Sequence, residues 1–156
     1  MNVLSWNCRG LGNQRAFQFL KETVTQKQPN FVFLCETKSN KARVEFVGRG
    51  LGYEGVFIVE AQGRSGGLAL LWKNEKDGRI IGFSQSHIDF MVEVEGNPKW
   101  RLTGVYGEPQ RQQRMDTWNL LRSLVNNSNA PWCVIGDLNN VLSQSDKRED
   151  NLIRVG

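Results

Sequence analysis

The chain has 156 residues, of which 39% are hydrophobic and 23% are charged, values typical of a soluble globular domain and not of a disordered segment. No apolar run approaches the roughly 20 residues that cross a membrane, and the N-terminal stretch lacks the features of a signal peptide. The net charge of +4 and the pI near 9.1 suit a polyanionic partner. We therefore expect one domain over residues 1–156, nuclear or cytoplasmic, with no membrane attachment.

Apolar periodicity predicts the elements in chain order. Strands are expected at 1–6, 31–35, 53–59, 68–72, 87–95, 100–106 and 132–135, and helices at 13–27, 41–50 and about 112–126. Asn13 is a suitable helix cap, and Asp77-Gly78 is typical of a hairpin turn. The run 31–35 is apolar throughout and predicts burial on both faces, whereas the alternation in 87–95 predicts a half-exposed strand. This order indicates an α/β protein with mixed sheets in a layered sandwich and helices outside.

Several reactive or aromatic side chains have an ordinary structural interpretation. Cys8, Cys35 and Cys133 have no C-x-x-C spacing and no histidine nearby, so we expect buried free thiols and neither a zinc site nor a nucleophile. His87, the only histidine, is expected at the surface of its strand. Trp118 lies on the apolar stripe of the last helix and is expected in the core.

Polar side chains stand at the carboxyl ends of four predicted strands. Asn7 follows the first strand, Glu36 the second, Tyr106 ends the strand 100–106, and Asp137 follows 132–135 with Asn139 just beyond. In layered α/β folds such strand ends converge on a crevice that binds ligands. One carboxylate at a strand end is ordinary, but four polar ends together favour a functional site.

These residue types suit metal-assisted cleavage of a phosphodiester. A carboxylate such as Glu36 and an amide oxygen such as Asn7 are ligands for Mg²⁺, or for Mn²⁺ in its place. Asp137 is suited to orient or deprotonate a water. Asn139 and the Tyr106 hydroxyl are suited to hold phosphate oxygens as charge develops.

Five stretches then carry a family resemblance: LSWNCRGLG, FLCETK, GRSGGLALLW, TGVYG and VIGDLNNVL, in this order. Together they resemble the endonuclease/exonuclease/phosphatase superfamily, and more narrowly the apurinic-type endonuclease domain of plant LINE (non-LTR) retrotransposons. The resemblance implies a DNase I-like two-sheet sandwich flanked by helices. It implies Asn7 and Glu36 in the metal site, Tyr106 on the scissile phosphate, and Asp137 and Asn139 in water activation and phosphate orientation.

The sequence departs from the family pattern in two ways. Leu138 and Asn140 replace a Phe and a Glu, which matters little for the chemistry. The family pattern continues to a Ser-Asp-His motif that supplies the catalytic histidine, and nothing printed here matches it. We therefore expect a partial sandwich whose apolar strand 132–135 lacks a neighbour and pairs with a second copy, the alternatives being a partly open fold or helices that cover the gap.

Basic side chains beside these motifs are candidates for contacts with substrate phosphates. Arg64 lies in a Gly-rich stretch that is either a phosphate cradle or a plain turn. Arg111 and Arg114 either touch nucleic acid or form a solvated face. The leading hypothesis is a Mg²⁺-dependent endonuclease of retrotransposon origin that acts on DNA, or on RNA. The second hypothesis is an inactive relative that binds nucleic acid or protein.

Overall fold

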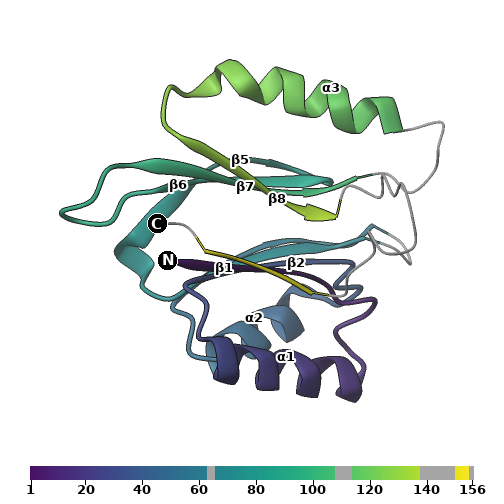
Figure 1. Ribbon diagram of the computed structural model, residues 1–156. Helices are drawn as coiled ribbons and strands as arrows, with labels where there is room; N and C mark the ends of the chain where they lie inside the picture. Colours follow the sequence, from purple (N-terminus) through teal and green to yellow (C-terminus); the bar gives the residue numbers. More distant parts are fainter. Residues whose placement is uncertain (63–65, 108–113, 138–149, 155–156) are drawn as a thin grey trace.

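A computed structural model describes residues 1–62, 66–107, 114–137 and 150–154 of the chain (Figure 1). The strands are β1 (Asn2–Asn7), β2 (Phe31–Cys35), β3 (Gly55–Val59), β4 (Leu68–Trp72), β5 (Gly78–Ser84), β6 (His87–Val92), β7 (Trp100–Tyr106), β8 (Trp132–Asp137) and β9 (Asp150–Arg154). The helices are α1 (Gln14–Lys27), α2 (Lys41–Gly50) and α3 (Arg114–Leu124), with short 3₁₀ turns at Glu75–Asp77 and Val125–Asn127.

The strands form two stacked sheets with helices on both outer faces, as Figure 1 shows. The first sheet has the order β3-β4-β2-β1-β9 and the second has the order β5-β6-β7-β8. β1 pairs parallel with β2, and β7 pairs parallel with β8, while the other neighbours are antiparallel. Helices α1 and α2 cover the first sheet, and α3 covers the second. The predicted α/β sandwich with outer helices is therefore confirmed.

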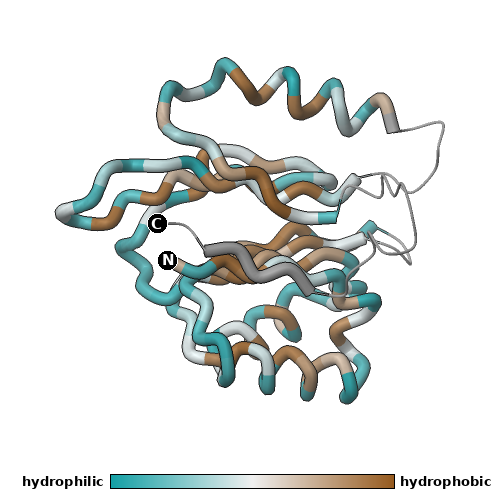
Figure 2. Tube along the Cα trace, viewed as in Figure 1, coloured by the Kyte–Doolittle hydropathy of each residue, from teal (hydrophilic) through white to brown (hydrophobic). Residues whose placement is uncertain are grey.

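The main core lies between the two sheets, where Figure 2 shows apolar stretches of both sheets facing each other. Phe33 of β2 is fully buried there. Its ring packs against β7 at Gly104, where an added Cβ would lie 2.3 Å from a ring carbon. The glycine therefore permits a close approach of the sheets at their centre.

A second core lies between the first sheet and its helices. Leu20 and Val24 of α1 are buried there. The Asn13 side chain accepts a hydrogen bond from the Arg15 N–H at 2.8 Å, which confirms the predicted cap. Asn40 caps α2 in the same way, accepting from the Arg43 N–H at 2.8 Å. No described helix combines the length and apolarity needed to span a bilayer.

Two predictions about local structure are wrong. The hairpin predicted at Asp77-Gly78 does not form, because β4 belongs to the first sheet and β5 to the second, so the chain crosses between sheets there. Trp118 does not lie in the core: it is 39% exposed, and its neighbour on the stripe, Met115, is 57% exposed. The face that α3 turns towards the sheet buries Leu124, which belongs to the predicted stripe, together with Thr117, which does not. Strand β9, which pairs antiparallel with β1, was not predicted.

We expect Gly104→Ala to destabilise the protein by about 1–3 kcal/mol, because the new methyl group meets the buried Phe33 ring. Gly82→Ala in β5 is the matched control, since its Cβ would have its nearest neighbour at 4.0 Å. Urea unfolding of both variants measures the difference. Equal effects of the two substitutions would contradict the close packing of the sheets at Gly104.

Candidate functional site

The four predicted strand ends lie at one end of the sandwich. Asn7 ends β1 and Glu36 follows β2, so the first sheet contributes an amide and a carboxylate. Tyr106 ends β7 and Asp137 ends β8, and these two residues are register partners in the second sheet. Parallel pairing within each sheet brings the two members of each pair to the same edge.

Side chains from the two sheets meet at Asn7. Its Nδ2 donates a short hydrogen bond to Glu36 Oε2, and the same nitrogen lies 3.3 Å from Asp137 Oδ2, to which it also donates. The Asn7 Oδ1 accepts from the Arg9 N–H at 3.0 Å. Lys38 Nζ lies 3.8 Å from Glu36 Oε1. The structure thus brings together Asn7, Glu36 and Asp137, two carboxylates around one amide.

The backbone beside these side chains is in an unusual conformation. Arg9, Glu36 and Lys38 have φ values of 50°, 50° and 48°, in the left-handed region that non-glycine residues seldom occupy. Such conformations cost about 1–3 kcal/mol each and persist where the surroundings hold them. Their clustering around Asn7 is typical of a functional site, where strain serves to aim side chains.

Hydrogen bonds between loops hold this backbone in place. The Gly10 N–H donates to the Glu36 carbonyl at 2.9 Å, and the Leu11 N–H donates to the Thr37 carbonyl at 2.8 Å. The Lys38 N–H in turn donates to the Gly66 carbonyl at 3.1 Å. The loops after β1 and β2 and the segment before β4 are therefore joined into one support for Glu36.

In the second sheet, Gly136 fixes where Asp137 lies. Gly136 has φ +127°, and an added Cβ would lie 1.9 Å from the Val105 carbonyl oxygen, so β8 approaches β7 more closely than any side chain permits. The Asp137 carbonyl accepts from the Gly107 N–H at 2.6 Å. Tyr106 is half-buried, and its N–H donates to the Ser86 carbonyl at 2.9 Å.

The side chains of the remaining predicted site residues are not among those that the structure describes. Asn139, Arg64 and Arg111 lie outside the described residues, and Arg114 begins α3 but its side chain is not described. Their roles stay predictions.

The predicted burial of the thiols is confirmed for Cys8 and Cys35 but not fully for Cys133. Cys8 and Cys35 are buried and Cys133 is partly buried, and all three are free. Burial raises the pKa of the Cys8 and Cys35 thiols well above the ordinary value, and the charges of nearby acidic groups, Glu36 among them, raise both further. Both thiols are therefore protonated at neutral pH, which makes them poor nucleophiles.

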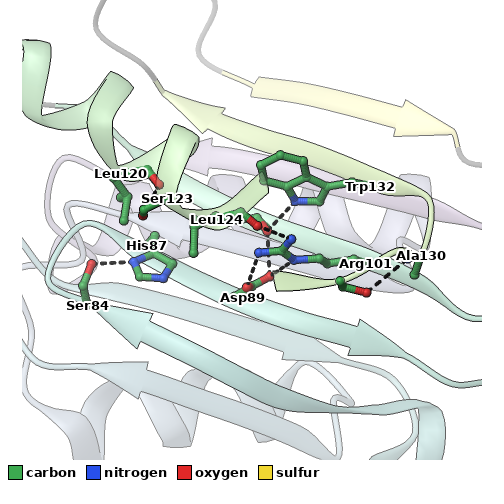
Figure 3. A network of polar contacts seen from close by, with 11 residues as sticks. Ser84, His87, Asp89, Arg101, Leu120, Ser123, Leu124, Ala130 and Trp132 are labelled. Atoms are coloured by element: carbon green, nitrogen blue, oxygen red, sulfur yellow. Dashed lines mark hydrogen bonds and ion pairs between the residues drawn. The ribbon is translucent and has the colours of Figure 1, made fainter. Parts of the chain in front are cut away.

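Sequence reasoning missed a buried polar cluster on the outer face of the second sheet, shown in Figure 3. Asp89, Arg101 and Thr103 are at most 2% exposed and hydrogen-bonded to one another. The prediction that strand 87–95 is half-exposed is thus wrong, because α3 covers its polar face. An arginine and an aspartate on one face of neighbouring strands were the available signal, but the alternation in the sequence is the same whether water or a helix lies outside.

His87 belongs to this buried face, so its predicted surface position is also wrong. It is 6% exposed, and its Nδ1 lies 2.5 Å from Ser84 Oγ (Figure 3). Desolvation lowers the pKa of His87 below 6.5, the negative charge of Asp89 partly offsets this, and Arg101 lowers the pKa further. The imidazole is therefore neutral at pH 7. It projects from the outer face of the second sheet, whereas Asn7 and Asp137 meet between the two sheets.

Comparisons with known proteins agree with this arrangement. The endonuclease/exonuclease/phosphatase family matches residues 4–155, so the chain belongs to that family. No curated protein sequence matches the chain significantly.

Three solved structures share the fold. D. rerio TDP2 complexed with a single-strand DNA product has a TM-score of 0.63 at 17% identity, over 89% of this chain and 60% of that one. The human Nocturnin catalytic domain with bound sulfate has a TM-score of 0.67 at 13% identity, over 90% of this chain and 64% of that one. The 3′ phosphatase NExo from Neisseria, bound to a product DNA hairpin, has a TM-score of 0.66 at 15% identity, over 94% of this chain and 60% of that one. The chain thus spans less than two thirds of each of these structures.

We expect Glu36→Gln to raise the free energy of unfolding in EDTA by about 0.5–2 kcal/mol, as is common where a site sacrifices stability to function. The neutral side chain still accepts from Asn7 but no longer repels Asp137. Glu45→Gln on α2, an exposed acid paired with Arg49, is the control and should change stability by less than about 0.5 kcal/mol. A loss of stability in Glu36→Gln would contradict the expected repulsion.

A further prediction concerns pH. The pKa of His87 is lower in the folded protein than in the unfolded chain, so the unfolded chain binds the proton more readily. Stability contributed by neutral His87 is complete above pH 6.5 and is lost as the pH falls through 6.5 towards the folded-state pKa. Urea unfolding between about pH 7.5 and pH 5.5 should show a larger loss for the wild type than for His87→Gln. Parallel pH dependence in the two proteins would refute this effect of burial.

Proposed function

We propose that the chain is a metal-dependent phosphodiester-cleaving domain of LINE retrotransposon origin that acts on DNA. The observation that carries the proposal is the convergence of Glu36 from the first sheet and Asp137 from the second on the Asn7 amide. The left-handed backbone conformation of Glu36 supports a functional interpretation, because such strain persists mainly where it positions a side chain.

The donor set fits a hard divalent cation. Carboxylate oxygens are the preferred ligands of Mg²⁺ and Mn²⁺, and here two carboxylates accept hydrogen bonds from a single nitrogen. Mg²⁺ usually keeps several waters and binds substrate phosphate oxygens, so water or substrate would complete the ligands. Glu36 would hold the ion, and Asn7 would join it through its amide oxygen, which now accepts from Arg9. When bound, the ion supplies charge neutralisation at a phosphate.

The chain's own side chains would do the rest. Asp137 would orient the attacking water and accept its proton, because it lies at the strand end opposite Glu36. Tyr106, its register partner, would donate a hydrogen bond to a phosphate oxygen, and Asn139 would do the same. Arg64, Arg111 and Arg114 would bind flanking phosphates.

DNA is the favoured substrate because two of the similar structures, TDP2 and NExo, hold DNA products. RNA is the alternative polyanion. The assignment to LINE elements rests on the stretches WNCRGLG and GDLNNVL in this sequence.

The second candidate function is binding without catalysis. It is favoured by the position of His87, the only histidine, which lies buried on the far face of the second sheet and cannot serve the site. A positioned acid–base group contributes about 10²–10⁴-fold to rate. In this case the chain would bind nucleic acid or protein, with self-association through β8, which has one described neighbour and a partly exposed Val134.

Nicking of supercoiled plasmid decides between the two functions. We expect Mg²⁺-dependent nicking that EDTA abolishes and that Glu36→Ala and Asp137→Ala reduce by about 10²-fold or more. Glu45→Ala, which removes an exposed acid of α2, should nick like the wild type.

If the folded wild-type protein nicks plasmid no faster than Asp137→Ala, the proposed enzymatic function is rejected. Fluorescence anisotropy with labelled single-stranded and duplex DNA would then test the binding function. Sedimentation at tens of micromolar would test self-association.

A further inference from the structure

Arg101 is the centre of the buried cluster on the outer face of the second sheet (Figure 3). It is 1% exposed, and its guanidinium makes two hydrogen bonds to Asp89, from Nε to Oδ1 at 2.8 Å and from Nη2 to Oδ2 at 2.6 Å. Its third nitrogen, Nη1, donates to the carbonyl of Leu124, the last residue of α3, at 2.7 Å. One side chain on β7 thus holds β6 and the end of α3.

The same cluster holds the beginning of β8. The Arg101 guanidinium lies over the Trp132 ring, 4.6 Å from its centroid. The Trp132 Nε1 donates to Thr103 Oγ1 at 2.8 Å, and that hydroxyl donates to Asp89 Oδ1 at 2.7 Å. The Arg101 N–H donates to the Pro131 carbonyl at 2.8 Å. Trp132 therefore has a polar and an aromatic contact that a shifted strand could not keep.

In the part of the chain that the structure describes, β8 has a neighbouring strand on one side only, so contacts of this kind add to its alignment with β7. It is the last strand of its sheet and is paired with β7 alone among the described strands. Side chains alternate along it: Cys133 and Ile135 face the core between the sheets, whereas Val134 is 37% exposed. A shift of one residue would turn every side chain to the opposite face and would take Asp137 away from Asn7.

An apolar cluster would bury this face without setting the register. Apolar side chains of similar volume often replace a buried ion pair without loss of stability. A buried polar group, in contrast, must meet a hydrogen-bond partner in the right direction, and this need can fix one alignment of neighbouring elements. On the first sheet the outer face is apolar, and β1 and β2, the two strands that lead to Asn7 and Glu36, have neighbours on both sides. On the second sheet the polar cluster lies where the edge strand begins.

We propose that Arg101, with Asp89 and Thr103, positions Asp137 by fixing the register of β8 on β7. These are positioning residues about one strand length from the site, and they touch no substrate. The part of this inference that concerns catalysis rests on the proposed function, while the part that concerns register does not.

Alkylation of Cys133 reads the register directly. In the native register this thiol packs against the core, and burial raises its pKa, so it should react slowly. The test variant is Asp89→Leu with Arg101→Met, which leaves no buried charge unpaired. We expect iodoacetamide to label Cys133 about tenfold faster or more in this variant, as mapped by mass spectrometry, under conditions in which both proteins are folded. Cys8 and Cys35 should stay unlabelled.

Val44→Ala is the matched control, because it destabilises the other core beneath the first sheet. It should lower overall stability without faster labelling of Cys133. If the double variant does not fold, Thr103→Val serves in its place, since it removes only the hydroxyl that joins Trp132 to Asp89. Arg101→Lys, which keeps the charge but loses the forked contact, should give an intermediate rate.

Nicking of plasmid by the same variants tests the functional part. We expect kcat to fall about tenfold or more while KM changes little, because the substrate contacts remain while Asp137 is misplaced. Unchanged Cys133 labelling would overturn the proposal whether or not the wild type is an enzyme. Faster labelling with wild-type kcat would overturn the link to Asp137. Faster labelling in a protein whose wild type does not nick would support the register role and reject the proposed function instead.

Discussion

The close stacking of two sheets whose parallel strand pairs end at the same edge is the constraint on which the site depends. Phe33 of β2 packs where β7 has only a glycine, and this contact brings β1 and β2 against β7 and β8. Neither sheet alone holds the site, since Asn7 and Glu36 come from one and Asp137 from the other. A change in the spacing or alignment of the sheets would therefore separate the two carboxylates.

The two outer faces of the sandwich are stabilised in different ways. α1 and α2 pack on apolar side chains such as Leu20 and Val24, a contact that tolerates small shifts because the hydrophobic effect has no direction. α3 covers the Asp89–Arg101 pair, in which nearly every donor has a named acceptor. A direction-dependent contact on the side of the edge strand is consistent with a site whose position is most easily lost through β8.

Much of this structure could be predicted from the sequence, for physical reasons. The run 31–35 is apolar at every position and is buried on both faces, and Asn13 caps its helix through its own side chain. Local patterns of this kind need no knowledge of the rest of the chain. The burial of His87 and Asp89 and the exposure of Trp118 could not be predicted, because each depends on which face of α3 meets a sheet formed by distant residues. The pairing of β9 with β1 joins the two ends of the chain and leaves no local pattern.

Binding of a divalent cation tests most directly whether the two sheets form one site. Titration of the purified protein with Mn²⁺, followed by electron paramagnetic resonance of the free ion, gives the stoichiometry and the dissociation constant. The account predicts one ion per chain, with an affinity reduced about tenfold or more both by Glu36→Gln in the first sheet and by Asp137→Asn in the second. Wild-type affinity in either variant would contradict a shared site.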